Sequence, residues 1–451
     1  MASLPARLRK YVGDRSIKTL LKGGLKAALI LMAGAVLSFS SNIMAARVLG
    51  AEGFGIYATA IAWMALLTGF GTVGLPQAVL RFIPAYRSLG QHANLAGFLR
   101  FVRYVLLGGA VVGGCLMLLA SVSGLGTPSA AQAMALAAVL LVVAVSLDVF
   151  SASLRAFGQL VWSMLPDHVL RHGVFLVGLF VLWLSFQGAP PPEAAIVAAI
   201  VATVIAVAVV GLRLRREPSY RQQTPDYQDM SRWWRLSLVS CVLVILFQTQ
   251  SQIALIMVGN TLGEVAAGQF AAARRLADIV TFGLLTINRV FVPTISSLHA
   301  LGDHAALQRS ATLTGIWSTL LAMAIALPML SAPHLTLSLF GPAFQDAATP
   351  LRIMLAAQIF NAATGAVTAL LTMTAREMVA LRTLLVAAVM QFILLLVLVP
   401  PFGLTGAATA FAIAIVFYNL AQLLAVWRSL GIACGLFGLF VRRPGAKDQG
   451  D

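Results

Sequence analysis

Acidic residues are scarce in this chain, which has 15 aspartates and glutamates against 31 lysines and arginines. Charged residues of both signs make up only 10% of the sequence, whereas 60% of it is hydrophobic. A soluble protein of 451 residues could not keep so much apolar surface away from water. The composition therefore excludes an ordinary soluble globular protein and indicates a membrane protein.

The sequence also has only three cysteines and no recognisable catalytic motif. Cys115, Cys241 and Cys434 lie in apolar stretches and lack the spacing of a metal or redox site. The six histidines form no metal-binding pattern, and the sequence has no Walker loop, kinase signature or catalytic triad. We therefore predict no catalytic residues, no metal and no cofactor, and we expect the protein not to be an enzyme.

Long apolar runs are what the sequence does contain. About twelve of them approach or exceed the ~20 residues that a helix needs to cross the hydrocarbon core. They cover residues 25–48, 54–82, 98–122, 130–156, 162–186 and 194–214, and then 236–259, 265–298, 311–332, 350–374, 379–399 and 404–427. The sequence thus predicts an all-α polytopic membrane protein, with about twelve transmembrane helices arranged as two six-helix bundles.

The net charge of +16 could suggest binding to nucleic acid, but its distribution argues otherwise. If the N-terminus is cytoplasmic and the chain crosses twelve times, most lysines and arginines fall in cytoplasmic segments. The positive-inside rule then places both termini in the cytoplasm and explains the charge without nucleic acid. The first apolar run is too long for a signal peptide, so we expect a retained span.

Two short segments occur twice in the chain. The segment from Leu49 to Ala58 is similar to Leu262 to Ala271, and the segment from Leu89 to Leu95 is similar to Leu301 to Leu307. Such repeats favour a duplicated transporter, in which two halves rock about a site between them. The predicted divisions are a basic N-terminus at 1–24, bundles at 25–214 and 236–428, a cytoplasmic linker at 215–235 and a cytoplasmic tail at 429–451.

The segment from Gly69 to Gly74 matches the pattern G-x-G-x-x-G. A dinucleotide-binding loop would need a strand before it, whereas this segment lies inside an apolar run. Small residues in a transmembrane helix permit close helix contact or a bend. We predict that role here, and a packing face at Gly109 and Gly113.

Polar residues inside the apolar runs are informative, because burying a charge in hydrocarbon is costly and marks a pathway or a partner. Arg274, Asp278, Thr281 and Asn288 fall on one side of a helix, with Arg275 adjacent to them. Arg274 and Asp278 are four residues apart and can neutralise each other. Alternatively, this side faces a hydrated cavity, where two arginines against one carboxylate suit a phosphate or diphosphate ligand.

Other polar positions give further candidates. Gln248 and Gln252 share a helix face and either bridge helices or bind sugar hydroxyls. Arg81 is either an anchor at the membrane boundary or a substrate ligand, and Arg47 either pairs with Glu52 or lines the mouth of a cavity. Asp148 and Asp278 are the candidates for proton or cation coupling. The predicted substrate-binding residues are Arg274, Arg275, Arg47, Arg81, Gln248 and Gln252.

The repeated segments, at Leu49–Ala58 and Leu262–Ala271, resemble the "LG-x-x-x-x-G-x-[YF]-A" turns of the polysaccharide transporter family. That family belongs to the multidrug/oligosaccharidyl-lipid/polysaccharide exporter superfamily and includes flippases for O-antigen and exopolysaccharide. The resemblance implies two six-helix bundles around a central cavity that opens alternately to the two sides. Gln252 departs from many relatives, which have an acidic residue near the start of the seventh span.

The resemblance also implies a function. We expect a flippase of the bacterial inner membrane that moves a polyprenyl-diphosphate-linked oligosaccharide to the outer leaflet for polysaccharide biosynthesis. Its partners would be the lipid-linked substrate, membrane lipids and the polymerase and export machinery. The alternatives are a cation-coupled multidrug exporter, a membrane glycosyltransferase or polymerase, which the short outer loops disfavour, and a non-transporting component of a polysaccharide assembly complex.

Overall fold

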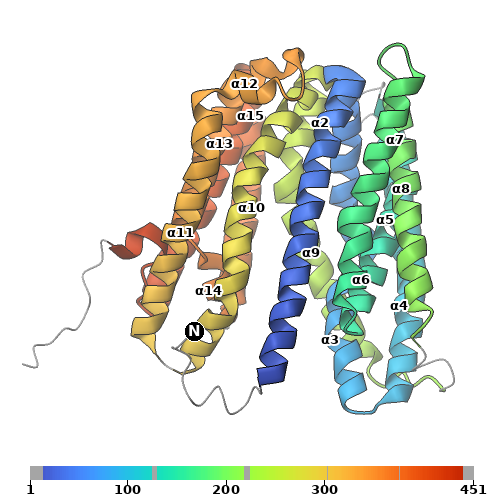
Figure 1. The fold of residues 1–451 in the computed structure, drawn as a ribbon, viewed down its shortest axis with the longest axis vertical. Helices are drawn as coiled ribbons and strands as arrows, with labels where there is room; N and C mark the ends of the chain where they lie inside the picture. Colours follow the sequence, from blue (N-terminus) through green and yellow to red (C-terminus); the bar gives the residue numbers. More distant parts are fainter. Residues whose placement is uncertain (1–13, 124–129, 218–223, 302, 375, 440–451) are drawn as a thin grey trace, which may run out of the picture. The chain divides into compact units, whose positions relative to one another are not determined.

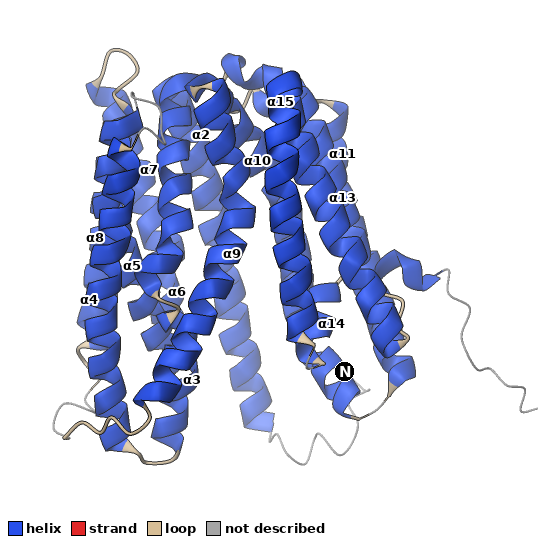
Figure 2. Ribbon diagram, turned by 180° about the vertical axis from the view of Figure 1, so that it is seen from behind, coloured by secondary structure: helices blue, strands red, loops and turns tan. Residues whose placement is uncertain are grey.

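A computed structural model of the protein describes residues 14–123, 130–217, 224–301, 303–374 and 376–439. Within these residues the chain is almost entirely helical and contains no strand (Figures 1 and 2). The elements in chain order are α2 (Asp14–Thr72), α3 (Leu75–Ser88), α4 (His92–Val122), α5 (Ala131–Ala156), α6 (Leu160–Leu165), η2 (Pro166–Leu170), α7 (Arg171–Ser185), α8 (Pro192–Leu214), α9 (Met230–Leu262), α10 (Glu264–Ala300), α11 (His304–Ser331), α12 (Pro333–Leu337), η3 (Pro342–Ala347), α13 (Ala348–Thr364), α14 (Val367–Met373), α15 (Glu377–Leu430) and η4 (Gly435–Leu439).

Each apolar run predicted to span a membrane lies mainly in helix, although the runs at 54–82 and 350–374 are interrupted at 73–74 and 365–366. Eight helices of the described chain are long and apolar enough to cross a membrane, or nine if the bent pair formed by η3–α13 and α14 is one span. Two of the long helices, α2 and α15, each join two helices across a kink, at Gly50 and Gly403. Each of these can therefore supply two of the predicted runs. The predicted fold class, an all-α polytopic membrane protein, is confirmed.

The repeated sequence segments have the same local structure. Gly50 and Gly263 both have a positive φ, 70° and 87°, and each lies where one helix passes into the next. Farther on, α4 begins at His92 and α11 begins at His304, which are the matching positions of the second repeat. A positive φ costs glycine little because it has no Cβ. The two leucine–glycine pairs are thus the same helix junction made twice.

The glycines of the G-x-G-x-x-G segment make the predicted bend and close contact. The helix α2 ends at Thr72, and Val73 and Gly74 then adopt left-handed φ values of 49° and 69° before α3 begins. A Cβ on Gly74 would lie 2.2 Å from the carbonyl oxygen of Ser237 in α9. A Cβ on Gly109 would lie 2.4 Å from the carbonyl oxygen of Gly71. The predicted packing role of these glycines is confirmed.

Neighbouring glycines of α4 offer a matched test of this packing. Gly109→Ala should lower the free energy of unfolding by about 1–3 kcal/mol, because its methyl group overlaps the backbone of Gly71. Gly108→Ala is the control, since a Cβ there meets nothing within 4 Å. It should be neutral or stabilise the helix by up to about 1 kcal/mol. Thermal unfolding of the purified variants in detergent measures both, and equal effects would contradict the assigned contact.

The chain forms two compact units, Met1–Ile245 and Leu246–Asp451, so the division falls within α9. The predicted bundle boundaries at 214 and 236 remain a prediction.

In the first unit α5 packs against α8, α4 and α2. Buried alanines along α5 and α8, such as Ala152 and Ala206, let these helices approach closely.

A cluster of aromatic side chains joins the start of α9 to α3 and α4 within the first unit. Trp233 is fully buried, and its indole nitrogen donates a hydrogen bond of 2.8 Å to the Tyr86 hydroxyl oxygen. Tyr86 in turn donates to the Asp229 carboxylate at 2.9 Å. The Trp233 ring lies edge-on to Phe98, with 5.4 Å between ring centroids. The segment before α9 is thereby held firmly to the first unit.

This cluster should make the stability of the protein depend on pH in the alkaline range. The pKa of Tyr86 is raised from 10.0 to about 12, mainly because burial disfavours the phenolate and also because of its contact with Asp229. The contribution is fully present below pH 10 and is lost as the pH rises toward 12, since the unfolded chain then releases a proton that the folded chain retains. The difference in unfolding temperature between the parent and Tyr86→Phe should therefore shrink over this range. If the difference in unfolding temperature stayed constant between pH 10 and pH 12, the predicted contribution of Tyr86 would be contradicted.

In the second unit, the segment after α15 folds back against α11. The Gln308 side chain accepts a hydrogen bond from the Ala433 amide at 2.8 Å and donates one to the Ala433 carbonyl oxygen at 2.6 Å. Cys434 is fully buried in an apolar cluster with Leu307 and Leu370. The segment after α15 thus begins in an apolar cluster of the second unit, and positions 440–451 lie outside the described residues.

A candidate anion-binding site in the second unit

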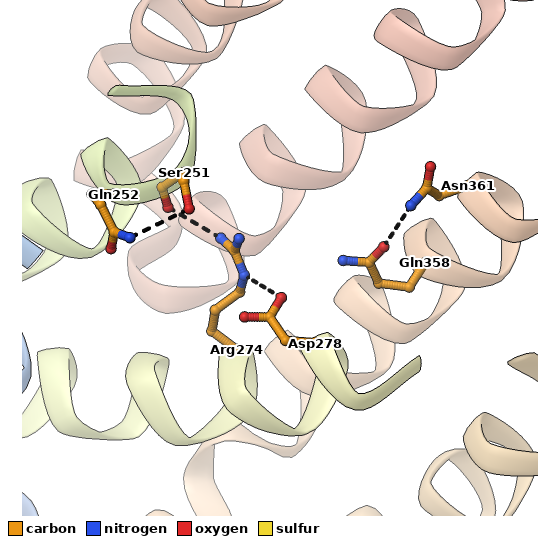
Figure 3. A network of polar contacts seen from close by, with 6 residues as sticks. All are labelled: Ser251, Gln252, Arg274, Asp278, Gln358 and Asn361. Atoms are coloured by element: carbon orange, nitrogen blue, oxygen red, sulfur yellow. Dashed lines mark hydrogen bonds and ion pairs between the residues drawn. The ribbon is translucent and has the colours of Figure 1, made fainter. Parts of the chain in front are cut away.

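Arg274 and Asp278 lie one helical turn apart on α10 and form an ion pair. The Arg274 Nε atom donates to the Asp278 Oδ1 atom at 2.9 Å, and the two side chains are 19% and 39% exposed. Figure 3 shows the Arg274 side chain pointing from α10 toward Ser251 on α9. Of the two predicted arrangements, pairing is therefore present, and the pair keeps access to solvent or lipid.

Two further contacts hold the Arg274 guanidinium. One terminal nitrogen donates to the carbonyl oxygen of Ser251 at 3.4 Å, and the guanidinium carbon lies 4.3 Å from the centre of the Phe411 ring. Phe411 is a buried residue of α15, so its ring is fixed in place. Stacking on an aromatic face suits the planar guanidinium and leaves its other N–H groups open to a ligand.

The residues next to this pair differ in exposure. Arg275 is exposed and forms no ion pair with a carboxylate of the described chain. Gln252 and Gln248 are half-buried on α9, and the Gln252 amide donates to the Ser251 hydroxyl oxygen at 3.4 Å. Two arginines against one carboxylate leave a net positive charge here. Asn288 belongs to the residues whose side chains lie outside the described part of the structure.

A row of polar side chains lies inside the same unit, on α13, α14 and α15. The Asn361 amide donates to the Gln358 carbonyl oxygen at 3.1 Å, and both residues lie in the region drawn in Figure 3. Thr364 donates to Asn419 at 2.9 Å. Thr368 donates to Gln422 at 2.7 Å. In membrane helices such bonds fix neighbouring helices to one another.

Three buried polar atoms of this unit have no hydrogen-bond partner within the described residues. They are the Thr281 hydroxyl, which lies one turn after Asp278, the amide nitrogen of the fully buried Gln391, and the Ser429 hydroxyl. An unsatisfied buried donor costs about 1–3 kcal/mol. The residues predicted from the sequence do not include Gln391, Gln358, Asn361 or Phe411. Gln391, Gln358 and Asn361 could have been found, because they are polar residues inside predicted apolar runs.

The other predicted residues lie in the first unit. Arg47 is exposed on α2, three residues before the kink at Gly50. Arg81 is exposed on α3, with its guanidinium 5.9 Å from the Phe82 ring. Asp148 is half-buried on α5 and accepts no hydrogen bond from the described residues.

A single turn of π-helix, η2, lies in the same unit as Asp148. Asp167 within it pairs with Arg171 at 3.0 Å and lies 3.5 Å from His168. The charges of Asp167 and Arg171 are among those that act on Asp148. π-helical turns inside α-helices occur frequently at functional sites. This charged turn was not predicted from the sequence.

Comparisons with solved structures show the fold. The chain is similar to the lipid II flippase MurJ in an inward closed conformation, with a TM-score of 0.72, 10% identity and coverage of 89% of this chain and 87% of that one. It is also similar to a multidrug resistance MATE family transporter of the MOP superfamily in an inward-facing conformation, with a TM-score of 0.70, 18% identity and coverage of 90% and 98%. A MOP superfamily transporter from Pyrococcus furiosus gives a TM-score of 0.59 at 16% identity, with coverage of 91% and 96%.

Sequence comparison defines the family. No curated protein sequence matches the chain. A family model described as "Polysaccharide biosynthesis protein" matches residues 20–299, which is more than half of the 451 residues. The resemblance drawn from the repeated turns is thus confirmed, and the chain is a multi-pass membrane protein that belongs to this polysaccharide biosynthesis family.

Proposed function

We propose that the protein is a flippase that moves a polyprenyl-diphosphate-linked oligosaccharide from the cytoplasmic to the outer leaflet of a bacterial inner membrane. The observation that carries this proposal is the Arg274 guanidinium, which is held by Asp278 and Phe411 beside the exposed Arg275. Family membership supports a role in polysaccharide biosynthesis. The fold supports a transporter, and one protein of similar fold is named a lipid II flippase.

The arginines suit the diphosphate of such a lipid. A guanidinium donates through a planar fork that matches the oxygens of a phosphate, and charge-assisted hydrogen bonds of this kind are among the strongest in proteins. The glutamines Gln248 and Gln252 supply amides for sugar hydroxyls one helix away. Arg47 and Arg81 would act as further contacts of the anionic headgroup. Transfer of the lipid changes no covalent bond. What the protein has to provide is a route for the polar headgroup through the hydrocarbon core.

Asp278 links binding to a driving ion in this proposal. Without substrate its carboxylate neutralises Arg274 at 2.9 Å. A bound diphosphate competes for the same guanidinium, and the released carboxylate can then take up a proton or a cation. Asp148 is the second coupling candidate, because it is a half-buried carboxylate without a described hydrogen bond. The substrate, the lipids around it and the polysaccharide polymerase and export machinery are the proposed partners.

Reconstitution tests the proposed function. Purified protein in liposomes should move a fluorescent polyprenyl-diphosphate oligosaccharide across the bilayer, and should not move a neutral glycolipid with the same sugars. Transport of cationic dyes without any movement of the diphosphate lipid would indicate a multidrug exporter instead. Movement of neither compound would favour a non-transporting component of an assembly complex.

A further inference from the structure

An apolar groove opens on the first unit between the end of α2, the α4 helix and the start of α9. Its volume is about 380 Å³, and its lining includes Phe70, Tyr104, Gly108, Val112 and Trp234. These residues belong to helices long and apolar enough to cross a membrane. An apolar groove on such helices suits a lipid acyl chain.

Local sequence explains why the groove exists. Tyr104, Gly108 and Val112 recur every four residues and therefore form one stripe along α4. Gly108 at the middle of the stripe has no side chain, and a Cβ there meets nothing within 4 Å. Trp234, which lines the groove, packs edge to face on Phe101 of α4, with ring centroids 5.2 Å apart.

The opposite wall contains a strained residue. Val73 lines the groove with a φ of 49°, which is rare for a β-branched side chain. Strain of this kind costs about 1–3 kcal/mol and occurs at ligand-binding and switch regions. It is held here by Gly74, whose backbone packs directly on Ser237 of α9. The groove wall is therefore a built feature of the first unit.

Three arginines lie close in sequence to the aromatic residues that line the groove. Arg100 lies one turn before Tyr104 on the same stripe, Arg103 precedes Tyr104, and Arg235 follows Trp234. All three are exposed, and none pairs with a carboxylate of the described chain. The nearby Arg232 differs, because Asp229 pairs with it at 3.0 Å. Aromatic residues such as Tyr104 and Trp234 are typical of the level of the lipid headgroups.

We propose that this groove binds an anionic glycerophospholipid. Its acyl chain lies along Gly108 between Phe70 and Val112, and its phosphate meets Arg100, Arg103 and Arg235. Basic surfaces between transmembrane helices attract anionic headgroups, and the positive-inside rule predicts that these arginines face the cytoplasm. A headgroup with a net negative charge matches three arginines that pair with no carboxylate of the described residues, whereas a zwitterionic headgroup does not. The site would hold a resident lipid beside the transported one.

Photocrosslinking tests the proposal with the full-length protein in nanodiscs. The probe is phosphatidylglycerol with a diazirine on one acyl chain, and mass spectrometry locates the labelled residues. We expect labelling within residues 104–112, and we expect unlabelled phosphatidylglycerol to compete while phosphatidylcholine does not. Gly108→Trp should reduce the labelling at least tenfold, because the indole fills the groove where a Cβ finds open space.

Matched variants separate loss of the site from a general disturbance. Gly173→Trp is the control for Gly108→Trp, since Gly173 is a glycine of α7 whose Cβ would also meet nothing within 4 Å. It should leave the labelling unchanged. Arg103→Gln and Arg235→Gln lie outside the packed core and should each weaken the preference for phosphatidylglycerol roughly fivefold.

Three results would overturn the proposal. One is equal labelling by phosphatidylglycerol and phosphatidylcholine probes. Another is unchanged labelling in Gly108→Trp together with an unchanged preference for phosphatidylglycerol in both Arg103→Gln and Arg235→Gln. The third is competition by a polyprenyl diphosphate alone, which would make the groove part of the substrate path.

Discussion

Replacing Arg274 with alanine should reduce the rate of flipping about 10- to 100-fold. The estimate follows from the loss of one charge-assisted hydrogen-bonding group, which is worth about 1.5–3 kcal/mol. Arg274 is the side chain that α9, α10 and α15 position together, through the Ser251 carbonyl, Asp278 and the Phe411 ring. The measurement is the initial rate of lipid movement in proteoliposomes with equal amounts of inserted protein.

Two variants make this prediction specific. Arg274→Lys keeps the charge but loses the planar fork and the stacking on Phe411, so it should restore only a small part of the rate. Arg382→Ala removes an exposed arginine of α15 in the same unit and should have little effect. Equal losses in Arg274→Ala and Arg382→Ala would mean that total positive charge, and not this position, governs transport.

Replacing Trp233 with alanine should be among the most destabilising substitutions in the first unit, at about 3–5 kcal/mol. Its side chain is fully buried, it contacts Phe98 and Phe101, and its indole N–H bonds to Tyr86. The substitution leaves a large cavity and removes one hydrogen bond of a buried tyrosine.

The neighbouring tryptophan provides the control. Trp234 is 38% exposed, so Trp234→Ala should cost much less of the free energy of unfolding than Trp233→Ala. Chemical unfolding of the two variants in the same detergent compares them directly. If Trp234→Ala proved the more damaging of the two, the assignment of Trp233 to the packed cluster would be contradicted.

The sequence was sufficient to predict features that depend on neighbouring residues. The apolar runs predicted the helices, and the repeated leucine–glycine pairs share a left-handed glycine at a helix junction, Gly50 and Gly263. The spacing of Arg274 and Asp278 allowed their ion pair, because residues four apart face each other on a helix. The bend at Gly74 followed from small residues in a span.

Features that join distant parts of the chain could not be predicted in this way. Tyr86 and Asp229 are 143 residues apart, and Thr364 and Asn419 are 55 apart, so no local pattern relates them. Phe411 beneath the Arg274 guanidinium is likewise one apolar residue among many in its run. The π-helical turn at Asp167 depends on how α2 and α8 pack against it, and helical periodicity does not reveal it.

The proposed diphosphate site is tested by the rate at which the Arg274→Ala/Arg275→Ala double variant flips a labelled polyprenyl-diphosphate oligosaccharide in liposomes. Transport should fall at least 100-fold while the protein inserts and unfolds like the parent, because both guanidinium groups that would hold the diphosphate are gone. Transport at the parental rate by a correctly folded double variant would contradict the proposed site.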